Sequence, residues 1–144
     1  MRKKIYRAGL IPLCVDNDNF DDSLMMFMIP SDQRYGGSSP QIAKGQIEDG
    51  ESAMEAALRE ANEELGLTDD RIMDLADCGT WLGRTHMFVA LVDTTDSALY
   101  NEPHFETQEV HWLTRQQFMQ HGRDIHRPVV DSLFELIRAN LEHY

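Results

Sequence analysis

Four acidic side chains lie within one short stretch of this chain, at spacings that could support metal chemistry. The stretch runs from Gly45 to Leu67 and reads GQIEDGESAMEAALREANEELGL, and its spaced carboxylates are those of Glu51, Glu60, Glu63 and Glu64. Crowded carboxylates repel one another unless a hard cation lies among them, and ligands that offer only oxygen suit Mg²⁺ or Mn²⁺. Because a diphosphate binds the same kind of cation, the stretch indicates chemistry at phosphate bonds.

The second part of this stretch has the pattern of a helix that opens after a glycine turn. On a helical wheel at ~100° per residue, one arc predicts the buried face, and it holds Met54, Leu58, Ala61 and Leu65. The three later glutamates fall together on the opposite side, in the half of the helix where the macrodipole disfavours anions. A solvated acidic face is the alternative interpretation of these three residues.

Residues around the glutamates favour a ligand site over a solvated face. Gly45 and Gly50 mark turns where the backbone can approach a ligand, and Gly66 stands where a helix C-cap glycine belongs. Glu51 precedes Arg59 by about two helical turns. We therefore expect a bidentate ion pair that braces the loop against the helix.

The rest of the chain must supply the elements that position this helix. Apolar, β-compatible segments predict strands at 4–16, 23–29, 41–44, 74–82, 85–93 and 109–113. Helices are predicted at 52–65, at 114–121 with Thr114 as N-cap, and from Pro128 to the end. Strands that dominate the chain, with one helix inserted and one at the end, predict an α+β sandwich with a mixed sheet between helices.

Composition limits the classes of partner. A chain of 144 residues favours a single domain over 1–144. The net charge of −12 argues against a surface that coats nucleic acid, although a divalent metal still allows a phosphorylated substrate. No stretch approaches the ~18 apolar residues of a membrane span. The two cysteines, Cys14 and Cys78, lack metal-ligand spacing, so we expect free thiols and a cytoplasmic protein.

The acidic stretch resembles the signature of the Nudix hydrolases, G-x5-E-x7-R-E-U-x-E-E-x-G-U, where U is a bulky aliphatic residue. The positions that match are Gly45, Glu51, Arg59, Glu60, Glu63, Glu64, Gly66 and Leu67. The one departure is Ala61, a small residue at the first U position. The resemblance implies the family's α/β/α sandwich and hydrolysis of a nucleoside diphosphate linked to another group.

Residue by residue, the resemblance also implies a metal site and a brace. Glu60, Glu63 and Glu64 would bind Mg²⁺ or Mn²⁺ as catalytic ligands, joined by the carbonyl oxygen of Gly45. Glu51 and Arg59 would be structural.

A further glutamate, Glu106, resembles the downstream metal ligand or base of some family branches, and Glu109 is the alternative. Lys44, in a PQIAKG segment similar to the lead-in of those branches, and Arg84 are candidates for phosphate binding. Tyr35, with Trp81 and Tyr100, is a candidate either for base stacking or for packing.

The resemblance ranks the substrates but does not choose one. Dinucleoside polyphosphates or RNA 5′ ends come first, ADP-ribose and similar nucleotide sugars second, and oxidised nucleoside triphosphates third. An alternative of a different class is a module that senses a nucleotide without cleaving it. A homodimer is expected from the resemblance only.

Overall fold

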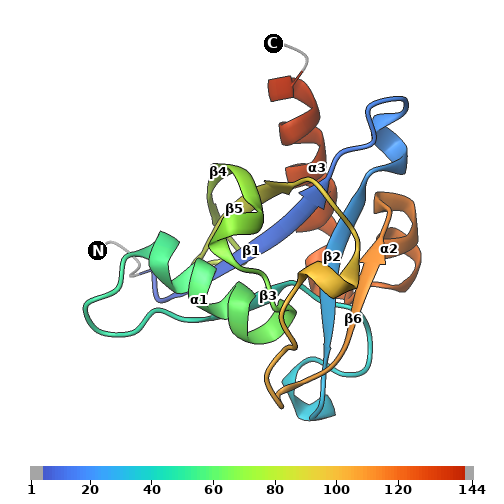
Figure 1. The fold of residues 1–144 in the computed structure, drawn as a ribbon. Coiled ribbons are helices and arrows are strands. Elements are labelled where there is room, and N and C mark those ends of the chain that lie inside the picture. The colour runs from blue at the N-terminus through green and yellow to red at the C-terminus, as the bar shows by residue number, and fades with distance from the viewer. Residues whose placement is uncertain (1–4, 142–144) are drawn as a thin grey trace.

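The fold is a mixed sheet between helices, seen here in a computed structural model that describes residues 5–141 (Figure 1). The strands are β1 (Arg7–Cys14), β2 (Leu24–Pro30), β3 (Ala43–Gln46), β4 (Ile72–Trp81), β5 (Thr85–Val92) and β6 (Thr107–Leu113). The helices are α1 (Ala53–Leu65), α2 (Arg115–His121) and α3 (Arg127–Leu141). The predicted α+β sandwich is therefore confirmed, including the short α2 that Thr114 caps.

Strand β1 lies at the centre of the sheet, whose order is β4-β5-β1-β2-β6, with β3 also paired to β1. On one side, β1 pairs in parallel with β5 along its whole length, from Arg7 to Cys14. Its antiparallel partners divide it, since β3 pairs with residues 7–10 and β2 with residues 13–14. Strands β2 and β3 thus diverge, and an isolated β-bridge between Met28 and Gln41 connects β2 to the residues just before β3.

Alternation along the strands fills two cores, one on each face of the sheet. Leu10, Met26 and Phe88 point to the face that α1 covers, where small helix residues pack against them. Their sequence neighbours Ile11 and Phe27 point to the other face, against α2 and α3. Because successive side chains point to opposite faces, a strand that is covered by helices on both faces is apolar at successive positions.

The buried face of α1 differs from the sequence prediction. Ala61 and Leu65 are buried as predicted, but Met54 is 46% exposed and Leu58 is only partly buried. Ala56 and Ala57, which the prediction left out, are completely buried. Alanines face the sheet because only small side chains let the helix backbone approach it closely. The prediction was centred on the large residues, so the acidic face that was placed opposite the core was also misplaced.

No helix within residues 5–141 combines the length and the apolar character that crossing a bilayer requires.

Candidate active site

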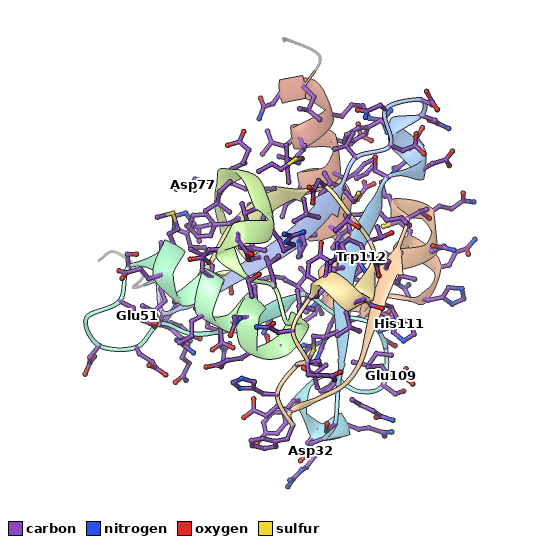
Figure 2. All side chains as sticks on the ribbon, viewed as in Figure 1. Asp32, Glu51, Asp77, Glu109, His111 and Trp112 are labelled. Atoms are coloured by element: carbon purple, nitrogen blue, oxygen red, sulfur yellow. The ribbon has the colours of Figure 1, made fainter. Side chains whose placement is uncertain are left out.

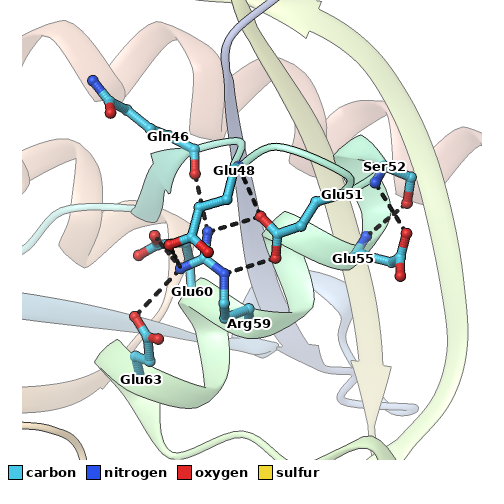
Figure 3. Close-up of polar contacts among 8 residues, drawn as sticks. All are labelled: Gln46, Glu48, Glu51, Ser52, Glu55, Arg59, Glu60 and Glu63. Carbon is cyan, nitrogen blue, oxygen red and sulfur yellow. Dashed lines mark hydrogen bonds and ion pairs between the residues drawn. The ribbon is translucent and has the colours of Figure 1, made fainter.

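Arg59 joins the loop before α1 to the acidic residues of the helix (Figure 3). Its guanidinium donates from Nε to Glu51 Oε2 at 2.8 Å and from Nη2 to Glu51 Oε1 at 3.0 Å, so the predicted bidentate pair is present. It also donates to Glu60 Oε1 at 2.9 Å and to the Gln46 carbonyl at 3.0 Å, and it lies 3.5 Å from Glu63 Oε2. One cation therefore fixes both the loop and a carboxylate of the helix.

The start of α1 is fixed by its own sequence. Ser52 and Glu55 form a capping box, in which each side chain accepts a hydrogen bond from the other residue's backbone N–H. At the other end Gly66 has φ +76°, and a Cβ there would meet the Asn101 carbonyl oxygen at 1.8 Å. Only glycine suits this C-cap, so local signals define both ends of the helix.

Glu60 and Glu64 share the inward face of α1 with the alanines. The Glu60 side chain is only 13% exposed and lies directly against Gly45, where a Cβ would meet Glu60 Oε1 at 2.2 Å. Burial raises the pKa of Glu60, and Arg59 opposes that shift. The absence of a side chain at Gly45 is thus what makes room for this carboxylate.

Glu64 is the most deeply buried carboxylate of the site. Burial, with Glu60 and Glu106 nearby, raises its pKa to about 8, although Lys44 and its backbone act in the opposite direction. Its Oε2 atom is inaccessible to solvent and has no hydrogen-bond partner within the described part of the chain. A buried carboxylate oxygen without a partner is costly, and a bound cation would relieve that cost.

The loop before β6 brings a distant glutamate to the helix. Thr107 Oγ1 donates to the Glu64 carbonyl at 2.9 Å, and the His104 N–H donates to the Glu63 carbonyl at 2.7 Å. Glu106 consequently lines the same cavity as Glu60 and Glu64. Its competitor in the sequence analysis, Glu109, is exposed on β6 and lies 2.9 Å from His111 Nε2 (Figure 2).

A cavity of about 720 Å³ contains these acids. Its acidic side is formed by Glu60, Glu64 and Glu106, and Glu63 is not part of the lining. Its basic lining residues are Arg7, Arg34, Lys44 and Arg123. A cavity with carboxylates and cations side by side suits a metal-bound polyanion such as a phosphate chain.

The two predicted phosphate-binding residues are placed differently. Lys44 lines the cavity, where burial and the cations Arg7 and Arg123 lower the pKa of its ammonium. Arg84 lies in the turn between β4 and β5, with its guanidinium 5.5 Å from the Tyr6 ring centre, and does not line the cavity.

Sequence reasoning missed Arg7, Arg123 and His126. Arg123 precedes the short helix η5 (Asp124–His126), and its Nη1 lies 3.2 Å from Gln41 Oε1. His126 is fully buried, and its Nδ1 accepts a hydrogen bond from the Ile42 N–H at 3.1 Å. Burial lowers its pKa to about 3, so the ring is neutral. No local motif marks these residues, which reach residues 40–46 from distant parts of the chain.

The side chains of residues 5–141 are not arranged as a closed metal site, because no group of three or more His, Cys, Asp or Glu side chains converges closely enough to hold an ion. The Arg59 guanidinium forms an ion pair with Glu60 and lies near the Glu63 carboxylate. The donor chemistry nevertheless fits Mg²⁺ or Mn²⁺, because every acidic donor is a carboxylate oxygen and Glu64 Oε2 has no partner among residues 5–141.

Replacing Gly45 with alanine is expected to lower kcat/KM by up to about a hundredfold, the effect of misplacing a catalytic group by about 1 Å. The new Cβ would overlap the Glu60 carboxylate and force it to move. The thermal unfolding midpoint should change little, because the displaced group is the end of a flexible side chain. Gly37→Ala cannot serve as a matched control, because Gly37 has φ +80°, a backbone conformation that strains alanine. Full activity of Gly45→Ala would show that the position of Glu60 is not critical.

Comparison with known proteins gives a family match and named relatives. A model of the NUDIX domain matches residues 13–133. An RNA pyrophosphohydrolase from a Shewanella species, strain ANA-3, is 28% identical over 123 residues, covering 68% of this chain and 71% of the relative.

Another RNA pyrophosphohydrolase, from Shewanella pealeana, is 42% identical over 50 residues, which cover 35% of this chain and only 29% of that protein. Among solved structures, a binary complex of a C. elegans Ap4A hydrolase has a TM-score of 0.69 at 17% identity. That match covers 97% of this chain and 99% of the other, and at this identity it shows a shared fold.

Proposed function

The chain belongs to the Nudix hydrolase family, and on that premise we propose that it is a Mg²⁺- or Mn²⁺-dependent pyrophosphohydrolase of dinucleoside polyphosphates or RNA 5′ ends. The observation that carries the proposal is the unpartnered, buried Glu64 Oε2 in a cavity that Glu60, Glu106 and several cations also line. Carboxylates attract the metal, and the cations attract the phosphate chain that the metal accompanies.

Glu60 and Glu64 would hold the metal, together with the Gly45 carbonyl oxygen. Glu63 would join them on leaving Arg59, which its side chain, 35% exposed, has room to do. A bound divalent metal supplies a more acidic water and neutralises charge at the attacked phosphorus. Arg59 orients Glu60 and keeps the loop that carries Gly45 against the helix.

Other residues of the cavity act on the substrate itself. Lys44, Arg7 and Arg123 would bind the phosphates on either side of the bond that breaks. Glu106, exposed at the cavity, would accept the proton of the attacking water. The water oxygen forms the new bond to phosphorus as the bridging phosphoanhydride bond breaks, and the cations stabilise the released phosphate.

The choice of substrate is supported by the number of cations and by the relatives. Arg7, Lys44 and Arg123 line the cavity, and Arg34, which pairs with Asp32, lines it as well, so several cations are available to a chain of phosphates. The curated relatives are named RNA pyrophosphohydrolases, and a solved protein of the same fold is named an Ap4A hydrolase. The net charge of −12 favours a substrate gripped through its phosphates over one bound along an RNA chain.

A substrate panel with Mg²⁺ and with Mn²⁺ tests this proposal. It contains diadenosine tetraphosphate, 5′-triphosphorylated RNA, ADP-ribose and nucleoside triphosphates, with products separated by chromatography. We expect at least about tenfold higher kcat/KM on one of the first two, equivalent to about 1.4 kcal/mol of transition-state binding. A preference for ADP-ribose would favour a nucleotide-sugar pyrophosphatase, and binding without cleavage would favour a nucleotide sensor.

We further propose a cytoplasmic, single-domain enzyme. Cys14 and Cys78 are both free and partly buried, as expected in a reducing compartment. Burial raises the pKa of the Cys78 thiol to about 11, which makes it unreactive. The homodimer stays a prediction from the resemblance.

A further inference from the structure

The loop before β6 passes beside the C-terminal end of α1 (Figure 1). The last carbonyl groups of a helix have no partner within it and need donors from elsewhere. Here the His104 N–H donates to the Glu63 carbonyl at 2.7 Å. Thr107 Oγ1 donates to the Glu64 carbonyl at 2.9 Å. The first donor is a backbone group, whereas the second is a side chain, so the second tie depends on which residue stands at position 107.

A β-bulge at the start of β6 turns Thr107 towards α1. Ile29 of β2 pairs with Glu109. The next residue of β2, Pro30, pairs with Thr107, so β6 holds one extra residue at this point. In a regular strand Thr107 would share the face of Glu109, which is exposed. The bulge places it instead on the face of Pro30 and Met28, which α1 covers.

Hydrogen bonds hold the backbone of Glu106 from two sides. On one side Thr107, the next residue in the chain, is only 8% exposed and is bonded to α1. On the other side the Ser31 N–H, just beyond β2, donates to the Glu106 carbonyl at 2.8 Å. Because Thr107 bonds to the carbonyl of Glu64, it joins the two backbone segments that carry Glu64 and Glu106. The separation of these two carboxylates in the cavity therefore depends on the Thr107 hydroxyl.

We infer that Thr107 is a positioning residue, whose hydroxyl holds Glu106 in place relative to Glu64 for proton transfer. The inference rests on the proposed function, in which Glu106 accepts the proton of the attacking water. A base is effective only within hydrogen-bond reach of the proton that it takes, and a shift of about 1 Å can cost about a hundredfold in rate. Thr107 does not itself line the cavity, so it acts through Glu106.

Thr107→Val tests the inference, because it removes the hydroxyl and nearly keeps the shape of the side chain. On the best substrate of the panel we expect kcat to fall by about 10–100-fold. KM should stay at its wild-type value, since the basic residues that line the cavity are unchanged. Thr107→Ser retains the hydroxyl and should keep wild-type kcat. If the serine variant were as slow as the valine variant, the hydroxyl would not be the group that matters, and the inference would be wrong.

A double-mutant cycle with Glu106→Gln shows whether Thr107 acts through Glu106. Glu106→Gln alone should lower kcat by about 10²–10⁴-fold, the usual contribution of a general base. Adding Thr107→Val to this variant should lower kcat no further, because the base that Thr107 positions is already lost. An equal fall in kcat in both backgrounds would show that Thr107 acts on another part of the molecule, and it would overturn the inference.

Ser23→Ala is the matched control for the loss of a buried hydroxyl. Ser23 is fully buried, its Oγ accepts a hydrogen bond from the Asp16 N–H at 2.8 Å, and it does not line the cavity. This variant should have a lower thermal unfolding midpoint and wild-type kcat. A fall in its kcat as large as that of Thr107→Val would mean that any lost buried hydroxyl impairs turnover, which would remove the case for Thr107.

Amide hydrogen exchange of the metal-free protein gives a readout that needs no turnover. In Thr107→Val the His104 N–H should exchange about 2–10-fold faster, because the neighbouring bond between the loop and α1 is lost. The Ser31 N–H, which joins the same loop to β2, should keep its wild-type rate. Equal acceleration at both amides would indicate a general loss of stability, and no change at His104 would mean that Thr107 does not hold the loop. Either result would contradict the inference.

The two kinds of measurement separate this inference from the proposed function. If the wild type cleaves a dinucleoside polyphosphate and Thr107→Val has the same kcat, the positioning role is wrong and the enzyme assignment stands. If no compound of the panel is cleaved, yet the His104 N–H alone exchanges faster in Thr107→Val, Thr107 does hold Glu106 relative to Glu64 and the catalytic proposal fails.

Discussion

Glu64→Gln is expected to lower kcat by about 10²–10³-fold, the loss typical of removing one group that stabilises transition-state charge. Glutamine keeps the shape and volume of the side chain but cannot supply the negative charge that a metal needs. The fold should survive, because the substitution replaces a buried, partly unsatisfied carboxylate by a neutral amide. The measurements are kcat on the best substrate of the panel and the thermal unfolding midpoint.

Glu109→Gln is the matched control for this experiment. Glu109 is also a glutamate that the sequence offers as a site residue, but it is exposed on β6 and does not line the cavity. It should retain wild-type turnover. If Glu64→Gln kept full turnover, the Glu64 carboxylate would have no part in the reaction. If the variant lost its cooperative thermal unfolding transition, the charge of Glu64 would be needed for the fold.

The helix of the site could be predicted from sequence because its signals are local. Ser52, Arg59 and Gly66 each act within a few turns of their partners, through a cap, an ion pair and a C-terminal turn. The strands could be predicted equally well, since apolar runs bounded by turn residues define them. Within residues 5–141 the predicted segments match the six strands of the sheet and helices α1, α2 and α3 to within a few residues, and the predicted ends at residue 4 and beyond 141 lie outside the described part.

The depth of the carboxylates could not be predicted in the same way. The helical wheel included Met54 and omitted Ala56 and Ala57, although a helix packed closely on a sheet buries its small residues. Glu60 and Glu64 are therefore part of the inward face and not of a solvated one. A wheel centred on Ala57 and Ala61 would have placed both carboxylates correctly.

The cations of the cavity depend on tertiary structure. Arg7 comes from the first strand, and the pairing of β1 with β3 brings it to Lys44. Arg123 comes from the connection before α3, and its N–H donates to the Pro40 carbonyl at 2.9 Å, a few residues before Lys44. Arg84 belongs to the β4–β5 turn, and no feature of its neighbours in sequence shows that this turn lies away from the cavity. Strand register and this loop contact together decide which basic residues line the cavity.

In a metal-free buffer, the free energy of unfolding is expected to fall as the pH rises from 6.5 to about 8. The pKa of Glu64 is raised from 4.5 to about 8, so the folded protein keeps a proton that the unfolded chain releases. Stability from this group is complete below pH 4.5 and is lost up to about pH 8, by at most about 1.4 kcal/mol per pH unit.

His126 has the opposite effect, but over a lower range. Its pKa is lowered from 6.5 to about 3, so the unfolded chain binds the extra proton, and stability from this group rises with pH up to 6.5. Above pH 6.5 the contribution of His126 is complete, and the part of the slope that Glu64→Gln removes reports Glu64. Urea denaturation at several pH values between 6.5 and 8, with a chelator present, measures it.

Saturating Mg²⁺ should remove the slope, because a cation beside Glu64 stabilises its carboxylate and lowers its pKa in the folded state. Glu64→Gln should show little slope with or without the metal, since it cannot titrate, and Glu109→Gln should behave as the wild type does. Equal slopes in the wild type and Glu64→Gln would mean that Glu64 is already ionised in the folded protein. A slope that persists in Mg²⁺ would place the ion away from Glu64, and the buried oxygen would then need another partner.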